Sequence, residues 1–152
     1  KVAVVERHQG TGNVACGFLK GYGIKEGAVA LSVAHDSHNI IVVGVNDEEM
    51  EFAVNSLIAQ EGGIVLVKEG KVIEQMPMPI AGLMSDQSGE WVDEKLTSIH
   101  EKAYTELGIC GDVEPVMTLC FMSLAVIPEI KLTDMGLFDV TTFSFIPVEI
   151  SR

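Results

Sequence analysis

Two short apolar runs, Ala28–Val33 and Ile40–Val43, constrain the fold of this chain more than any other feature of its sequence. Each has the length of a β-strand, and its apolar residues follow one another instead of alternating with polar ones. A strand with one face in water alternates, whereas a strand covered on both faces does not need to. The two runs therefore predict strands that are buried between layers on both faces of a sheet.

Two helices are predicted from capping residues and apolar periodicity. Asn46 is a good N-cap residue, and the acidic residues at 47–49 suit the positive end of a helix dipole. Apolar residues then recur at helical spacing until the glycine pair at 62–63, which predicts the end of this helix. A second apolar stripe predicts a helix from about Glu90 to Leu107, followed by Gly108.

The remaining segments carry weaker local signals. Val2–Val5 and the last apolar segment, 143–150, are predicted strands, and 64–67 with 72–76 form a predicted hairpin around a KEGK turn. The polar, Gly-rich connection 7–13 leads into a predicted short helix at 14–20. Segment 117–124 fits a buried strand or a buried helix, because periodicity does not separate the two, and 127–139 is predicted to be mostly turn.

These elements together indicate an α/β fold, with α+β as the alternative. We expect a mixed β-sheet of about six strands flanked by helices, in two or three layers. A length of 152 residues suits a single domain spanning 1–152. The chain starts inside a strand pattern without an initiator Met, so we expect it to be a piece of a larger polypeptide.

Composition excludes some partners and leaves one question open. The net charge of −12 argues against nucleic acids and anionic membranes, whose phosphates the chain would repel. The longest apolar stretch, 116–127, is shorter than the roughly 20 residues of a membrane-spanning helix. Three cysteines without C-x-x-C spacing indicate reduced thiols in a cytoplasmic protein. The 47% apolar content fits either an apolar interior or an interface with another domain or subunit.

The segment between the two buried strands contains the main candidate site. It holds five consecutive polar residues, more than a turn requires: His35, Asp36, Ser37, His38 and Asn39. One interpretation is a turn whose short polar side chains bond the backbone. A second is a metal site, although one loop would leave part of the coordination without ligands. A third is a loop that lines a pocket completed by another domain, with donors and acceptors suited to a polar heterocycle.

Arg7 and His8 strengthen the third interpretation. They follow the first predicted strand as His35 follows the second, so in a parallel arrangement both loops leave the same edge of the sheet. The nearby GTGNVACG segment does not match a dinucleotide fingerprint and lacks the Lys-Ser/Thr of a nucleotide P-loop. We interpret it as a glycine-rich turn.

Four long motifs resemble the C-terminal domain of bacterial and archaeal adenine deaminases, which belong to the amidohydrolase superfamily. They occur in the family's order over about 5–150: RHQGTGN, GYGIKEGAVALSVAHDSHNIIVVGVND, GGIVLVKEGKVIEQMPMPIAGLMSD and IPEIKLTDMGLFD. The H-x-E and P-C-x-x-C signature of cytidine-deaminase-like zinc enzymes is not in this sequence.

The resemblance implies hydrolysis of adenine to hypoxanthine and ammonia by a full-length enzyme. In the family, a divalent metal, manganese or iron, activates water inside a (β/α)₈ barrel. That barrel is not in these residues, so the resemblance implies an accessory domain that binds no metal itself and is inactive alone. It also implies that residues 35–39, with Arg7 and His8, lie near the active site. We expect the barrel, adenine and further copies of the chain as partners.

Two other hypotheses remain open at this stage. A purely structural or oligomerisation domain would explain the apolar content without any site residues. An autonomous domain that binds a purine or another small molecule would explain the polar loop.

Overall fold

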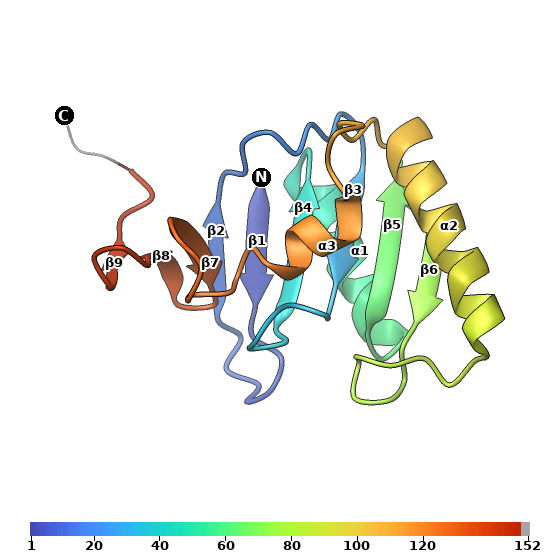
Figure 1. Ribbon diagram of the computed structural model, residues 1–152, viewed down its shortest axis with the longest axis horizontal. Coiled ribbons are helices and arrows are strands. Elements are labelled where there is room, and N and C mark those ends of the chain that lie inside the picture. Colours follow the sequence, from blue (N-terminus) through green and yellow to red (C-terminus); the bar gives the residue numbers. More distant parts are fainter. Residues whose placement is uncertain (150–152) are drawn as a thin grey trace.

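The two continuously apolar runs form the centre of a six-stranded sheet in the computed structural model, which describes residues 1–149. The strand order is β2-β1-β4-β3-β5-β6 (Figure 1). The strands are β1 Val2–Val5, β2 Val14–Gly17, β3 Ala28–Leu31, β4 Ile40–Gly44, β5 Gly63–Lys68 and β6 Lys71–Pro77.

Helices cover both faces of this sheet, so the molecule has three layers. Helix α1, Asp47–Ala59, packs on one face, while α2, Gly89–Thr105, and α3, Pro115–Cys120, pack on the other (Figure 1). Along β3, Val29 and Leu31 face the α2 and α3 side, whereas Ala28 and Ala30 face α1. Both sets are fully buried, which explains why the run is apolar at successive positions.

The predicted architecture of about six strands flanked by helices is confirmed, and all its strand pairs are antiparallel. This pairing corresponds to the α+β alternative. The sequence predicts parallel strands before the two polar loops, and this prediction is wrong for strands that are neighbours in the sheet. For example, β3 and β4 are joined by residues 32–39, a connection shorter than the dozen or so residues that a parallel crossover needs. However, β1 and β3 both pair antiparallel with β4, so they run in the same direction and end at the same edge.

The short helix predicted at 14–20 is wrong, because this segment contains strand β2. Val14 to Gly17 pair with Val5 to Val2 at the edge of the sheet. A four-residue apolar segment is too short to form a stable helix, whereas β1 offers it a full row of backbone partners. Tertiary pairing therefore overrides the local signal.

The structure resolves the open interpretation of 117–124 in favour of a helix at its start. Helix α3 begins at Pro115, a residue suited to the first turn, and the Glu114 side chain accepts a hydrogen bond from the Met117 N–H. Val116, Leu119 and Cys120 are buried against the sheet.

The C-terminal part forms a second, three-stranded sheet where mostly turn was predicted. Its strands are β7 Ile130–Thr133, β8 Gly136–Asp139 and β9 Ser144–Ile146. Strand β9 lies within the strand predicted at 143–150, and Ile150 lies outside the described residues. Both predicted long helices and the 64–76 hairpin are confirmed, with small shifts at their ends. Among the described residues, no helix combines the length and apolarity needed to cross a bilayer.

Candidate functional site

Three loops meet at one edge of the six-stranded sheet, the lower edge in Figure 1. They follow β1, β3 and β6, which run in the same direction through the antiparallel pairing. The first loop holds Arg7 and His8, the second holds residues 35–39, and the third holds Ala81 and Gly82. The prediction that Arg7, His8 and the 35–39 segment leave the same edge is thus confirmed, although by antiparallel pairing.

Arg7 holds the three loops together. Its Nε donates to the carbonyl of His38 at 2.6 Å, and its Nη2 donates to the carbonyl of Ala81 at 2.7 Å. Its backbone N–H donates to Oδ1 of the buried Asn39 at 3.2 Å. Gly82 permits this close approach, because a Cβ there would lie 2.6 Å from Nη1 of Arg7. The planar guanidinium fork suits two carbonyls at fixed positions.

His8 and Glu6 stabilise the first loop itself. Nε2 of His8 lies 2.6 Å from the carbonyl of Ser37, which links the first and second loops. The Glu6 carboxylate accepts hydrogen bonds from the backbone of His8, Gln9 and Thr11. Desolvation raises the pKa of Glu6, but these hydrogen bonds outweigh it and lower the pKa to about 2. Glu6 therefore stays ionised as the anchor of this loop.

The two histidine rings of the second loop lie side by side, and His35 also packs on the end of α3. The His35 ring is 5.7 Å from the His38 ring and 5.0 Å from the Phe121 ring. The His35 backbone N–H donates to the carbonyl of Cys120 at 2.8 Å. Desolvation, and then the nearby His35 and Arg7, lower the pKa of His38 below its usual 6.5. His38 is accordingly a neutral imidazole at pH 7.

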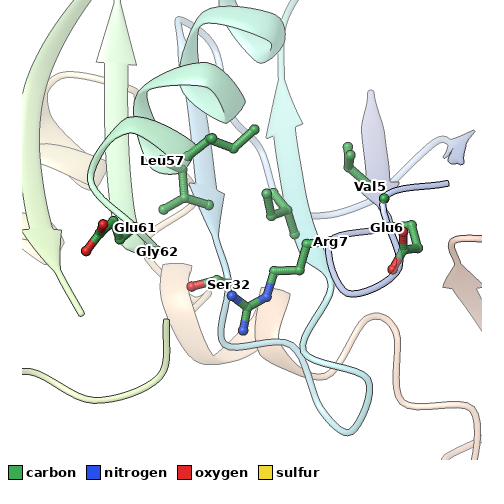
Figure 2. A pocket seen from close by; sticks show the side chains of 10 residues that line it. Val5, Glu6, Arg7, Ser32, Leu57, Glu61 and Gly62 are labelled. Carbon is green, nitrogen blue, oxygen red and sulfur yellow. The ribbon is translucent and has the colours of Figure 1, made fainter. Parts of the chain in front are cut away.

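A cavity of about 340 Å³ opens beside Arg7 (Figure 2). Arg7, Ser32 and Glu61 supply polar groups to its lining, and Val5 and Leu57 are among its apolar residues. Oγ of Ser32 accepts from the Gly63 N–H at 2.8 Å and donates to the Gly82 carbonyl, so its hydroxyl is already engaged. Of the seven predicted site residues, Arg7 lines this cavity.

A second cavity of about 370 Å³ lies between the tip of the second loop and the three-stranded sheet. Asp36 and Ser37 line it, together with apolar residues of the C-terminal part such as Val126 and Phe145. Both Asp36 and Ser37 are exposed. Within residues 1–149, His8, His35, His38 and Asn39 line neither of these two cavities. The predicted residues thus form one cluster but do not face one shared cavity of this chain.

Sequence reasoning missed several residues that shape this edge. The Ala81 carbonyl, Gly82 and Ser32 join the loops, Glu61 lines the first cavity, and Phe121 packs on His35. The sequence offered one signal that could have identified Ser32, Ala81 and Gly82: they lie within the long motifs that resemble the family. Backbone carbonyls and glycines leave no chemical signature that points to a site.

Residues 1–149 do not offer a place for the metal that the family resemblance implies. Within residues 1–149, no group of three or more His, Cys, Asp or Glu side chains is arranged to hold a metal ion. His35, Asp36 and His38, considered as ligands from the sequence, are not such a group.

The structure is that of an α+β domain in which three polar loops, held together by hydrogen bonds from Arg7, lie at one edge of the sheet. Residues 1–144 match the family model described as the adenine deaminase C-terminal domain, so the chain belongs to that family.

Curated relatives agree with this assignment. The chain is 76% identical over 149 residues to "Adenine deaminase 2" of Desulfotalea psychrophila, and 51% identical over 150 residues to "Adenine deaminase" of Halalkalibacterium halodurans. It is 49% identical over 149 residues to "Adenine deaminase" of Bacillus velezensis. These matches cover 98–99% of this chain but only 26% of each relative. The chain therefore spans about a quarter of the length of these proteins.

Proposed function

We propose that this chain is a single accessory domain, 1–152, of a metal-dependent adenine deaminase, and that it presents the 35–39 loop to the active site. The reaction is adenine plus water to hypoxanthine plus ammonia. The family match and the names of relatives support the activity. The observation that carries the role of the loop is the Arg7 clamp, which holds two neighbouring loops against the 35–39 segment.

The chain's own residues supply positioning and polar groups in this proposal. Asp36 and Ser37 project from the clamped loop with an exposed carboxylate and hydroxyl, which accept or donate hydrogen bonds to a polar purine edge. The neutral imidazole of His38 offers either a donor or an acceptor. Pre-ordering these groups avoids the entropic cost of fixing them when substrate binds.

The remaining components belong to the part of the enzyme that this chain does not cover. We propose that a (β/α)₈ barrel there binds a divalent metal, manganese or iron, which supplies an activated water when bound. We also propose adenine as the substrate, assembly of the enzyme into a homo-oligomer, and a cytoplasmic location. In this proposal the isolated domain releases no ammonia from adenine.

Substitutions in the full-length enzyme test the role of the loop. We expect His35→Ala and His38→Ala to lower kcat/KM for adenine by roughly 10- to 100-fold, with unchanged metal content. His100→Ala is the matched control, because His100 lies on α2 outside the loop cluster. Ammonia release measures turnover, and elemental analysis measures the metal. Wild-type turnover in both loop variants would exclude the proposed role.

A purely structural domain is the second candidate, favoured by the exposed apolar side chains of the C-terminal sheet. In that case the same histidine substitutions would shift the melting temperature or the oligomeric state and leave kcat/KM unchanged. The two candidates therefore differ in the measured quantity that responds.

A further inference from the structure

We propose that the outer face of the β7–β9 sheet is the surface on which the uncovered part of the same polypeptide packs. This inference rests on the proposed function and identifies the docking surface of the domain. We call it the aromatic surface and define it by five residues: Val126, Met135, Phe138, Phe143 and Phe145.

The aromatic surface exposes large apolar side chains in one place. Phe143 is 78% exposed, Met135 72%, Val126 71% and Phe145 52%. Phe138 lies between the two other phenylalanines, with both ring centroids 5.2 Å away in edge-to-face geometry. Packed aromatic clusters of this kind are typical of the centres of protein interfaces.

The pairing register shows that this small sheet carries apolar side chains on both faces, with the buried Lys131 beside Phe138 on the outer face. Leu132 pairs with Leu137, and this pair packs toward the hydrophobic core beside β1 and β2. Phe138 pairs with Phe145 at the adjacent register position, so these two rings lie on the opposite face. Segment 123–126 and the tip of the second loop line a cavity beside Phe138 and Phe145, and Phe145 is still 52% exposed. A sheet apolar on both faces is normally covered on both.

The aromatic surface is continuous with the proposed functional loop. The cavity of about 370 Å³ has Val126, Phe138 and Phe145 on one side and Asp36 with Ser37 on another. A partner that covers these rings therefore lies within contact distance of the loop tip. Docking here brings the exposed polar groups to the partner's surface without a further change of the domain.

The uncovered part of the polypeptide is the occupant that fits these observations. The chain spans 26% of the relatives it matches, so a much larger partner is present on the same polypeptide at high effective concentration. The outer faces of both long helices carry charged side chains, as expected for faces in contact with water. These side chains are Asp47, Glu48 and Glu51 on α1 and Glu90, Asp93 and Glu94 on α2. The five residues of the aromatic surface carry no charge and adjoin the loop, and Asp134 lines the same cavity.

Site-specific crosslinking in the full-length enzyme tests this proposal. The photoreactive amino acid p-benzoylphenylalanine replaces Phe145, and in a control replaces Phe52, a partly exposed phenylalanine on α1. Equal amounts of ¹⁴N- and ¹⁵N-labelled enzyme are mixed before assembly and irradiated. We expect single-isotope products that join position 145 to residues outside this domain, at roughly tenfold higher yield than from position 52.

Two outcomes would overturn the proposal. Mixed-isotope products from position 145 would show that a second copy covers the surface. A yield no higher than that from position 52 would show that the surface faces water. Replacement of Met135 provides a second position if the Phe145 variant does not fold, as judged by gel filtration.

The crosslinking result and the effect of the histidine substitutions on turnover can be distinguished from one another. If single-isotope crosslinks form while the His35 and His38 variants keep wild-type turnover, the docking surface stands and the proposed loop function fails. If the variants lose turnover without such crosslinks, the loop function stands and the docking surface fails.

Discussion

Arg7 is the residue on which the geometry of the site edge depends. Its guanidinium and backbone N–H contact Ala81, His38 and Asn39, which lie far away in the sequence. Two of these partners are backbone carbonyls, so within residues 1–149 the Arg7 guanidinium forms no ion pair and acts through directed hydrogen bonds. Arg7 is thus a positioning residue, and its substitution should affect the loops before the rest of the fold.

We expect Arg7→Lys to loosen the 32–39 and 78–88 loops. A lysine ammonium lacks the planar fork that reaches two carbonyls at once. Losing one or two of these hydrogen bonds should lower the free energy of unfolding by about 1–2 kcal/mol. Hydrogen exchange by mass spectrometry measures the loops, and urea unfolding measures stability. Lys71→Arg, in the exposed hairpin, is the charge-preserving control. Unchanged exchange in both loops would contradict the clamp.

At the level of elements, an ionic cluster joins α2 to β6. The Glu74 carboxylate accepts from Lys95 and Lys102 at 2.8 Å each, and from Ser98. Desolvation raises the pKa of Glu74, but the hydrogen bonds from Lys102, Lys95 and Ser98 outweigh it and lower the pKa to about 2. The cluster therefore favours the docked position of α2 as long as Glu74 is ionised.

We expect Glu74→Gln to lower the free energy of unfolding by about 2 kcal/mol at pH 7. The folded-state pKa lies below the ordinary 4.5, so this contribution is complete above pH 4.5 and is lost as the pH falls toward 2. The difference in the free energy of unfolding between wild type and Glu74→Gln should therefore become smaller as the pH falls from 4.5 toward 2. Urea unfolding at a series of pH values checks this narrowing, with Glu94→Gln, an exposed position on α2 outside the cluster, as control. A pH-independent difference would argue against the ionic cluster.

At the level of the whole molecule, the three-stranded sheet is joined to the larger part through few apolar contacts. Leu132 is buried between the two sheets, and Leu137 packs beside it, near Gly17 of β2. The outer face of the small sheet carries the aromatic surface. The small sheet thus connects the core of this domain with the partner that we propose.

We expect Leu132→Ala to cost about 2–4 kcal/mol of stability in this region. The cavity left at the junction should speed hydrogen exchange in β7 and β8 while β3 and β5 keep their slow exchange. Met117→Ala, at an exposed position on α3 outside the aromatic surface, should change stability by less than about 0.5 kcal/mol. Equal acceleration of exchange in all strands would mean that the two sheets unfold as one unit.

Local sequence patterns predicted the elements that carry their own signals. The α1 helix has Asn46 at its N-cap and acidic residues in its first turn, as expected. Strands β3 and β4 lie at the predicted apolar runs, and β5 pairs with β6 as the predicted hairpin. These signals act within a few residues, where capping, dipole and burial preferences dominate the free energy.

Elements that depend on a distant partner were not predictable in this way. Val14–Gly17 forms a strand because the edge of β1 is open to it, and β7 pairs with β8 within the segment 127–139, which local signals predict to be mostly turn. The antiparallel order follows from the whole set of connections, which no single window of sequence contains.

The chemistry of the site edge was readable from the chain alone, since five adjacent polar residues between buried strands are visible without coordinates. Folding decided their neighbours: the Ala81 carbonyl at Arg7, Phe121 at His35, and the apolar wall beside Asp36. The physical reason is that residue types identify donors, acceptors and charges, whereas contacts between distant segments arise only when the chain packs. The same packing leaves three phenylalanines on an outer face.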